Sequence, residues 1–490
     1  MRLLSSVFPS PPSHQFVLSA CLALFLGGLV GVSSTQAQGF AVTTHGSCVT
    51  GRAGTAAAVG CGDGSSIYYN PANLAATEGF TASLGATVIR TWTDFMYDSI
   101  AEAPSTGRTV KSVRSPQPVP HGYLSYRVSD RVSLGLGAYA PYGLGTEWPQ
   151  KLDDGTYFDG AFLSFKSRLQ SIYVQPTIGI QASEKLRVGF GPIIAISTLE
   201  LNRLQDLSQV PTPTGATFGQ IGVPFHTAFA RSSLESDPAT GFGLNLGLSY
   251  EVSERLRLGG RFMSSVDLSY EGDASFEQID TGLTVPVDLT DENGNVVIPA
   301  GTPLDNVIAS RFQSGGLLRT QSLNTGITLP MQVVGGVSFQ ATDALLLLAD
   351  YQFTEWSVFE EVALNFEEAQ LNQVIEQNYE NSHTIRLGAE YELFDGLTAR
   401  GGYVHSTAAT PDETVTPQLA ENTRNQFALG IGWRPIDRFE VDAAYQLTQQ
   451  NDRRGRVRGP LSGETLSTDL NQGLFKAGAS LFATTLTLHL

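Results

Sequence analysis

The chain has 490 residues and a formal net charge of −17 at pH 7; 16% of its residues are charged and 51 are glycine. The acidic balance argues against nucleic acid as a partner, and a mean hydropathy of −0.03 is too low for a bundle of membrane helices. The sequence carries no phosphate-binding loop, metal-ligand cluster or recognisable nucleophile setting, so we expect no enzyme activity, no cofactor and no bound metal.

Residues 1–37 are predicted to be a secretory signal peptide. An apolar stretch from Phe16 to Val32 precedes Thr35-Gln36-Ala37, a small-x-small cleavage site that would leave Gln38 or Gly39 first. An uncleaved membrane anchor is the alternative. Beyond this segment no apolar run reaches the roughly 18 residues that a spanning helix needs.

Residues 38–78 are rich in Gly and Ala and show no sustained periodicity. Two cysteines remain after cleavage, Cys48 and Cys61, and an even count in an oxidising compartment favours a disulfide between them. Two free thiols are the alternative. Asn70-Pro71-Ala72 predicts a turn, because Pro fixes its own φ and Asn bonds its own backbone readily.

From residue 79 onward, apolar and polar residues alternate in fourteen segments. In the clearest, 255–270, Leu258, Phe262, Leu268 and Tyr270 share one face. A period of two indicates strands with different surroundings on their two faces, and behind an export signal it predicts a transmembrane β-barrel over residues 79–490. The expected strands are 79–92, 119–128, 131–141, 165–181, 185–198, 239–252, 255–271, 326–341, 344–356, 381–393, 396–407, 423–434, 438–449 and 473–490.

The connections between these strands alternate in length. Tight turns such as 128–131 and 252–255 alternate with long connections such as 199–238 and 272–325. This pattern is typical of the periplasmic and extracellular ends of an outer-membrane barrel. A soluble β-sandwich, the alternative, needs no such regularity. Acidic residues in the long loops would suit divalent cations that bridge lipopolysaccharide.

Five short motifs, taken in chain order, form a pattern that can be compared with known families. They are Gly39-Phe40, Gly51-Arg52-Ala53, Asn70-Pro71-Ala72, the stretch 140–149 and the stretch 354–359. In these the chain resembles the FadL/TodX family of outer-membrane transporters for long-chain fatty acids and other hydrophobic compounds. The resemblance implies a monomeric all-β barrel of 14 strands, with residues 38–78 as a plug, or hatch, inside it. It also implies passive uptake of hydrophobic small molecules, most of all long-chain fatty acids.

The resemblance further implies a route. Loops capture the ligand, the plug moves, and the ligand leaves sideways near the third strand. For this we expect a kink at Pro141 and Gly143, although Pro141 could simply begin a loop. The candidate hatch and gating residues are Gly51, Arg52, Asn70, Pro71 and Ala72.

Candidate ligand-binding residues are Arg257, Arg400 and Arg424 in the lumen and Phe225 and Phe229 in a long loop. A fatty-acid carboxylate needs a cationic partner screened from water, but pairing with wall carboxylates is the alternative for each arginine. Met263, His405 and Ser406 depart from the family pattern, which leaves aromatic hydrocarbons open as cargo. The sequence also leaves open a barrel that hydrolyses lipids and a purely structural barrel.

Overall fold

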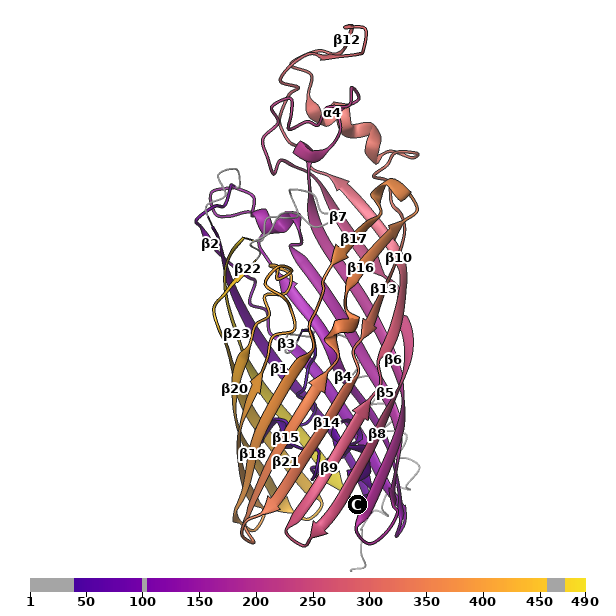
Figure 1. The fold of residues 1–490 in the computed structure, drawn as a ribbon, viewed down its shortest axis with the longest axis vertical. Helices are drawn as coiled ribbons and strands as arrows, with labels where there is room; N and C mark the ends of the chain where they lie inside the picture. The colour runs from indigo at the N-terminus through magenta and orange to yellow at the C-terminus, as the bar shows by residue number, and fades with distance from the viewer. Residues whose placement is uncertain (1–38, 99–103, 456–471) are drawn as a thin grey trace, which may run out of the picture.

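The computed structural model describes residues 39–98, 104–455 and 472–490; the predicted signal peptide lies outside this part of the chain. Fourteen antiparallel wall strands form a closed barrel, because the first strand pairs with the last from Thr81–His489 to Tyr97–Gly473 (Figure 1). The predicted fold class and strand number are therefore confirmed.

Ten wall strands are continuous and four are interrupted. The continuous ones are β1 (Phe80–Tyr97), β3 (Gln117–Ser129), β4 (Val132–Glu147), β5 (Lys166–Gln181), β6 (Leu186–Asp206), β18 (Ser382–Phe394), β19 (Leu397–Ser406), β20 (Arg424–Ile436), β21 (Phe439–Gln450) and β23 (Gly473–His489). The interrupted ones are β8 (Ala239–Ser253) with β7 (Ala228–Ser236), β9 (Leu256–Met263) with β10 (Val266–Gln278), β14 (Gln332–Gln340) with β13 (Gln321–Leu329), and β15 (Leu345–Thr354) with β16 (Glu361–Phe366). Short strands β2 (Thr109–Lys111), β17 (Gln373–Glu376) and β22 (Arg453–Gly455) lie beside them.

Two expected strands required correction. Residues 326–341 do not form one strand, because the strand breaks at Pro330-Met331 between β13 and β14. We predicted that residues 255–271 form a single strand with one apolar face, but the strand breaks at Ser264-Ser265. Leu258 remains on the outside, 46% exposed, whereas Leu268 is only 1% exposed and packs in the core. Ser264 N–H donates to Leu244 O (2.9 Å) and Leu244 N–H to Ser264 Oγ (3.0 Å), so side chains beyond this step point to the opposite face.

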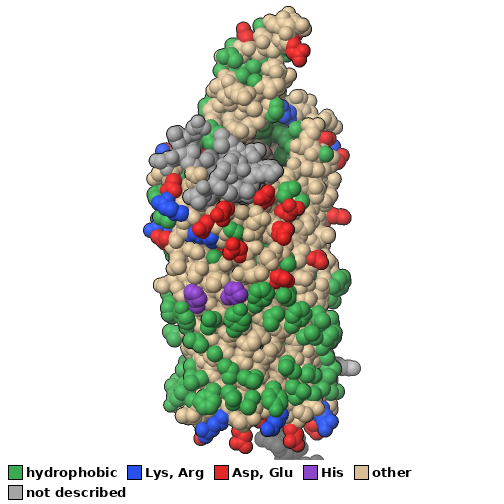
Figure 2. All heavy atoms as spheres, viewed as in Figure 1, with side chains coloured by type: hydrophobic (Ala, Val, Ile, Leu, Met, Phe, Trp, Pro, Cys, Tyr) green, Lys and Arg blue, Asp and Glu red, His purple; other side chains and the backbone are tan. Residues whose placement is uncertain are grey.

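The outside of the barrel is apolar over the half nearest the short turns. Large apolar side chains form a band there, with charged residues below it and mostly polar residues above it (Figure 2). Members of the band include Leu84, Val88, Phe190, Leu387, Leu429, Phe482 and Leu486, each at least 39% exposed. A continuous apolar surface of this extent marks contact with lipid. Among the described residues, no helix has the length and apolarity to cross a membrane.

The long-loop end carries a projection above the barrel. It holds β11 (Leu289–Thr290), β12 (Val296–Ile298), α4 (Leu304–Ile308) and the 3-10 helix η4 (Ala309–Phe312) (Figure 1). Its apolar core is shared with the loop after β6, through Leu207 and Phe218, and with Phe229, which we expected in a loop but which lies in β7. Other 3-10 helices are η2 (Asp159–Phe162), η3 (Leu207–Gln209), η5 (Trp356–Val358) and η6 (Ala369–Leu371).

Residues 39–78, called the inner segment below, fold within the ring of strands. They form α2 (Ser47–Gly51), α3 (Ser66–Tyr69) and the 3-10 helix η1 (Pro71–Ala76), and most of them are buried. The segment contacts walls on different sides: Tyr123 Oη on β3 donates to His45 O (2.8 Å), and Asn70 Nδ2 donates to Leu248 O on β8 (2.9 Å).

Candidate functional site

An apolar cavity lies in the lumen toward the long-loop end. It holds about 940 Å³ of space between atoms, part of it open to solvent. Apolar side chains from many elements line it, among them Phe40, Leu169, Leu201, Leu234, Leu323, Ile327, Phe359, Leu364 and Leu419. Such a lining suits a largely apolar ligand.

Charged groups stand at one side of this cavity. Arg168, Glu200, Glu235 and Glu271 belong to its lining, and Lys166 Nζ lies 2.5 Å from a Glu200 carboxylate oxygen. Arg168 is 3.9 Å from the same carboxylate and remains partly exposed. The cavity therefore combines an apolar interior with one lining cation, Arg168, and three lining carboxylates, of which Glu200 pairs with Arg168 and with the adjacent Lys166.

Phe40 of the inner segment forms one wall of the cavity. Its ring packs edge-on against Trp356 (4.7 Å between centroids), Phe359 (5.3 Å) and Tyr142 (6.3 Å). The preceding Gly39 has φ +61°, and a Cβ there would come within 2.6 Å of the Trp356 ring. Only glycine fits that position, because both the backbone conformation and the indole exclude a side chain.

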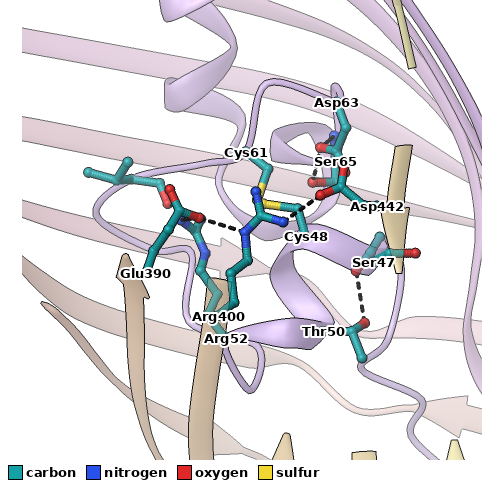
Figure 3. The surroundings of a disulfide bond; sticks show 12 residues. Ser47, Cys48, Thr50, Arg52, Cys61, Asp63, Ser65, Glu390, Arg400 and Asp442 are labelled. Carbon is teal, nitrogen blue, oxygen red and sulfur yellow. Dashed lines mark hydrogen bonds and ion pairs between the residues drawn. A yellow bond between two sulfur atoms is a disulfide. The ribbon is translucent and has the colours of Figure 1, made fainter. Parts of the chain in front are cut away.

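The inner segment is bound to the walls by buried charges. Arg400 on β19 lies between two carboxylates (Figure 3): its Nε donates to Glu390 (2.7 Å) and its Nη1 pairs with Asp442. Arg52 of the inner segment reaches the same Glu390 at 3.7 Å. Breaking such a buried network by removing one partner costs about 3–5 kcal/mol.

A disulfide joins Cys48 to Cys61 across thirteen residues of the inner segment (Figure 3). The closed loop contains Gly51, whose added Cβ would come within 2.9 Å of the Gly430 Cα on β20. It also contains Ala56 and Ala57, whose N–H groups donate to Asp350 on β15 at 2.8 and 3.0 Å. Sequence reasoning missed Asp350, because an inward carboxylate on an alternating strand resembles any other lumen charge.

Asn70-Pro71-Ala72 ends the compact part of the inner segment. Asn70 Oδ1 accepts from Ala72 N–H (3.0 Å), and its Nδ2 donates to Ala57 O (2.5 Å) as well as to β8. Pro71 begins η1, where a missing N–H leaves no gap in a hydrogen-bond pattern. Asn70 thus ties together the disulfide loop, η1 and the wall.

Burial alters the pKa of two groups in the inner segment. His45 is fully buried between Tyr68 and Tyr139, and burial lowers the pKa of its imidazole to about 3. Burial raises the pKa of Asp63, although hydrogen bonds from Ser65 oppose the rise. Both shifts favour the neutral side chain, as a site shielded from water requires.

The wall has a gap between β3 and β4. Their pairing ends at Gly122–Ala138, and the next hydrogen bond between the two sides joins Val113 N–H to Glu147 O (2.8 Å). The stretches 114–121 and 139–146 face each other without pairing, and are called the wall gap below. The β4–β5 register also shifts between Tyr139 and Tyr142, so Ala140-Pro141 forms a bulge that turns β4 away from β3.

The inner segment covers the free edge of β4. Gly143 N–H donates to Phe40 O, and Val42 N–H donates to Pro141 O, both at 2.8 Å. The inward side of the wall gap is apolar, with Val42, Val119 and Ala140 in one buried cluster. Pro141 and Gly143, selected from the sequence as kink residues, therefore lie at a bulge beside the wall gap. Sequence reasoning missed the opposite edge, where Pro116, Pro118 and Pro120 alternate.

The predicted ligand-binding residues do not form one site. Arg257 pairs with Glu251 (3.1 Å) near the short turns, and Arg400 pairs as described. Arg424 is buried beside Glu421 at 3.8 Å; in the described part of the chain its guanidinium nitrogens have no hydrogen-bond partner. Phe225 stacks on His226, and Phe229 packs on Phe312 below the projection. None of the five lines the apolar cavity.

Comparisons with known proteins agree with this architecture. The family model described as outer membrane protein transport protein (OMPP1/FadL/TodX) matches residues 28–488. The long-chain fatty acid transport protein of Escherichia coli (strain CFT073) is 22% identical over 429 residues, covering 85% of this chain and 88% of that protein.

Two solved structures share the fold. A Pseudomonas aeruginosa FadL homologue has TM-score 0.73 at 19% identity and covers 92% of this chain and 99% of its own. The Pseudomonas putida toluene transporter TodX has TM-score 0.64 at 16% identity, covering 91% and 99%. With the family match spanning nearly the whole chain, the protein belongs to the OMPP1/FadL/TodX family and is an outer-membrane transporter of hydrophobic substrates.

Proposed function

We propose that the protein carries long-chain fatty acids passively from outside the cell into its outer membrane, and that the inner segment acts as the gate. The supporting observation is the position of Phe40. Its ring lines the apolar cavity while its carbonyl oxygen covers the β4 edge at the wall gap. A ligand that displaces this residue therefore uncovers the gap.

The orientation follows from loop length. The long loops and the projection face outward, and the short turns face the periplasm. Phe225, half-buried at the base of the projection, gives arriving ligands a first contact, whereas Phe229 is buried in the core of the projection. The ligand then enters the cavity, passes the displaced Phe40 and leaves through the wall gap into the outer leaflet. No step requires an energy source, because an apolar solute moves from water to lipid.

Long-chain fatty acids fit the cavity better than wholly apolar ligands do. Lys166 and Arg168 stand beside an apolar interior and share one carboxylate, so a second carboxylate completes their pairing. Arg424, whose guanidinium has no hydrogen-bond partner among the residues that the structure describes, is a third cation for a carboxylate that moves deeper. The Escherichia coli relative is named for long-chain fatty acids. The likeness to a toluene transporter favours aromatic hydrocarbons as the second candidate cargo.

The proposal is tested by uptake into liposomes that contain the purified full chain. Leu201→Trp fills the cavity, and we expect oleate uptake to fall at least about tenfold. A tenfold fall corresponds to raising the free-energy barrier to uptake by only about 1.4 kcal/mol. Leu84→Trp, on the lipid-facing surface, is the matched control and leaves uptake unchanged. Uptake of toluene but not of oleate would show that the substrates are aromatic hydrocarbons and not fatty acids. Equal uptake by the protein, the blocked variant and empty liposomes would overturn the proposal.

A further inference from the structure

The edge of β3 that faces the wall gap cannot donate hydrogen bonds. β3 pairs with β1 without interruption from Tyr126–Phe80 to Gln117–Ile89. In an antiparallel strand, alternate residues direct their N–H groups to opposite neighbours. Arg127 N–H donates to Gly79 O, on the side of β1 (2.9 Å), so the odd-numbered residues of β3 face β1 and the even-numbered residues face β4. Above Gly122 these positions in β3 are Pro120 and Pro118, and Pro116 lies just before β3 begins; proline has no N–H.

The β3 edge without N–H donors lies at the level of the lipid. Pro118 lies opposite Val88, whose outward side chain belongs to the apolar band, so the gap opens at the level of lipid. Strand edges are not tolerated in hydrocarbon, because each unsatisfied N–H costs several kcal/mol. Proline removes that group. The carbonyl groups that remain are tolerated unpaired more often than N–H groups are.

The two edges of the wall gap differ in how their N–H groups are satisfied. On the β4 side, the N–H of Gly143 is satisfied by Phe40 of the inner segment, a partner that can leave. On the β3 side, Pro118 and Pro120 have no N–H that needs a partner. If β3 carried ordinary residues, a β4 edge freed by movement of the inner segment could pair with it and close the wall.

We propose that Pro116, Pro118 and Pro120 are positioning residues that hold the wall gap open whether or not the inner segment covers β4. The inference rests on the proposed lateral exit and extends it: opening the route needs only the inner segment to move, because the wall cannot close behind it. The bulge at Ala140-Pro141 and the proline edge are then two separate causes of one gap.

The test replaces the three prolines with residues that restore the donors and favour strands, P116T/P118V/P120T, in the full chain in nanodiscs. Hydrogen–deuterium exchange with residue-level fragmentation measures the new amides at these positions. We expect exchange at positions 118 and 120 to slow roughly 30-fold relative to an unpaired chain, as two added hydrogen bonds imply, and oleate uptake to fall at least tenfold. Pro192→Val, at an exposed wall proline on β6, is the control and leaves uptake unchanged.

The outcomes separate the two proposals. Fast exchange at the new amides of positions 118 and 120 in a folded barrel would overturn the role of the prolines. Slow exchange with uptake unchanged would confirm that the prolines keep the edges apart and would overturn the lateral exit instead. Circular dichroism checks that the barrel has formed. If the triple variant does not fold, Pro118→Val alone gives the same readout at one amide.

Discussion

Asp350 should control how firmly the inner segment is held. Its Oδ2 accepts from Ala56 N–H (2.8 Å) and Ala57 N–H (3.0 Å), and the carboxylate is 4% exposed. Asp350→Ala leaves two buried donors without an acceptor. At about 1–3 kcal/mol for each, the inner segment loses roughly 2–6 kcal/mol of its attachment.

This loss should appear as local opening. About 1.4 kcal/mol corresponds to a factor of ten, so even the lower limit raises the open population roughly 25-fold. Hydrogen–deuterium exchange of the peptide spanning 48–61 measures this population directly. Oleate uptake should rise where opening limits the rate.

Two variants sharpen the test. Asp350→Asn retains one oxygen acceptor and should lie between the wild type and Asp350→Ala. Asp343→Ala removes an exposed carboxylate from the turn that precedes the same strand and should change nothing. Unchanged exchange at 48–61 in Asp350→Ala would show that the two hydrogen bonds do not hold the inner segment, and the reasoning would fail.

Three further predictions concern cargo, disulfide and pH. Gln at both Lys166 and Arg168 should reduce oleate uptake and leave toluene uptake unchanged; an equal effect on both cargoes would exclude a carboxylate contact. Cys48→Ser with Cys61→Ser should destabilise the inner segment by about 2–4 kcal/mol, seen as faster exchange at 48–61 but not in the wall strands. His45, with a pKa lowered to about 3, stabilises the folded segment fully above pH 6.5 and less as pH falls. Between pH 7 and 4.5 the loss is about 3 kcal/mol, measured by exchange, and His45→Gln should abolish that pH dependence.

The alternation of apolar and polar residues was sufficient to predict the barrel. It succeeds because each wall strand faces two different solvents, so a period of two repeats along almost every strand. It failed at Ser264-Ser265. The apolar residues keep the same spacing of two on both sides of this break, but those before it face outward and those after it face the core. Composition cannot reveal such a step, because it depends on the hydrogen bonds between Ser264 and Leu244.

The candidate site was only partly predictable. Pro141 was selected because proline interrupts a ladder, and the same argument applies with more force to three prolines spaced by two. The expected second strand began at residue 119, two residues late, which left Pro118 in a loop. The lumen arginines could not be assigned from sequence, since pairing such as that of Arg400 depends on which strands are neighbours.

Phe40 leads to a final prediction about ligand length. Its ring occupies one side of the cavity and its carbonyl oxygen accepts from Gly143, so a ligand that reaches the ring competes with the cover of the wall gap. A ligand too short to reach it binds without opening the gate. In a series of saturated fatty acids from octanoate to stearate, we expect the short members to bind and to inhibit oleate uptake without being carried.

Binding is measured by displacement of a fluorescent fatty acid, and uptake is measured in the same liposomes. Phe40→Ala removes the packing against Trp356 and Phe359 that the ligand must overcome, so it should extend uptake to shorter members of the series. Phe482→Ala, which removes an aromatic ring from the lipid-facing surface, is the control. Two results together would show that displacement of Phe40 is not the opening step: uptake that follows binding affinity at every chain length, and no change by Phe40→Ala in the shortest fatty acid that is carried.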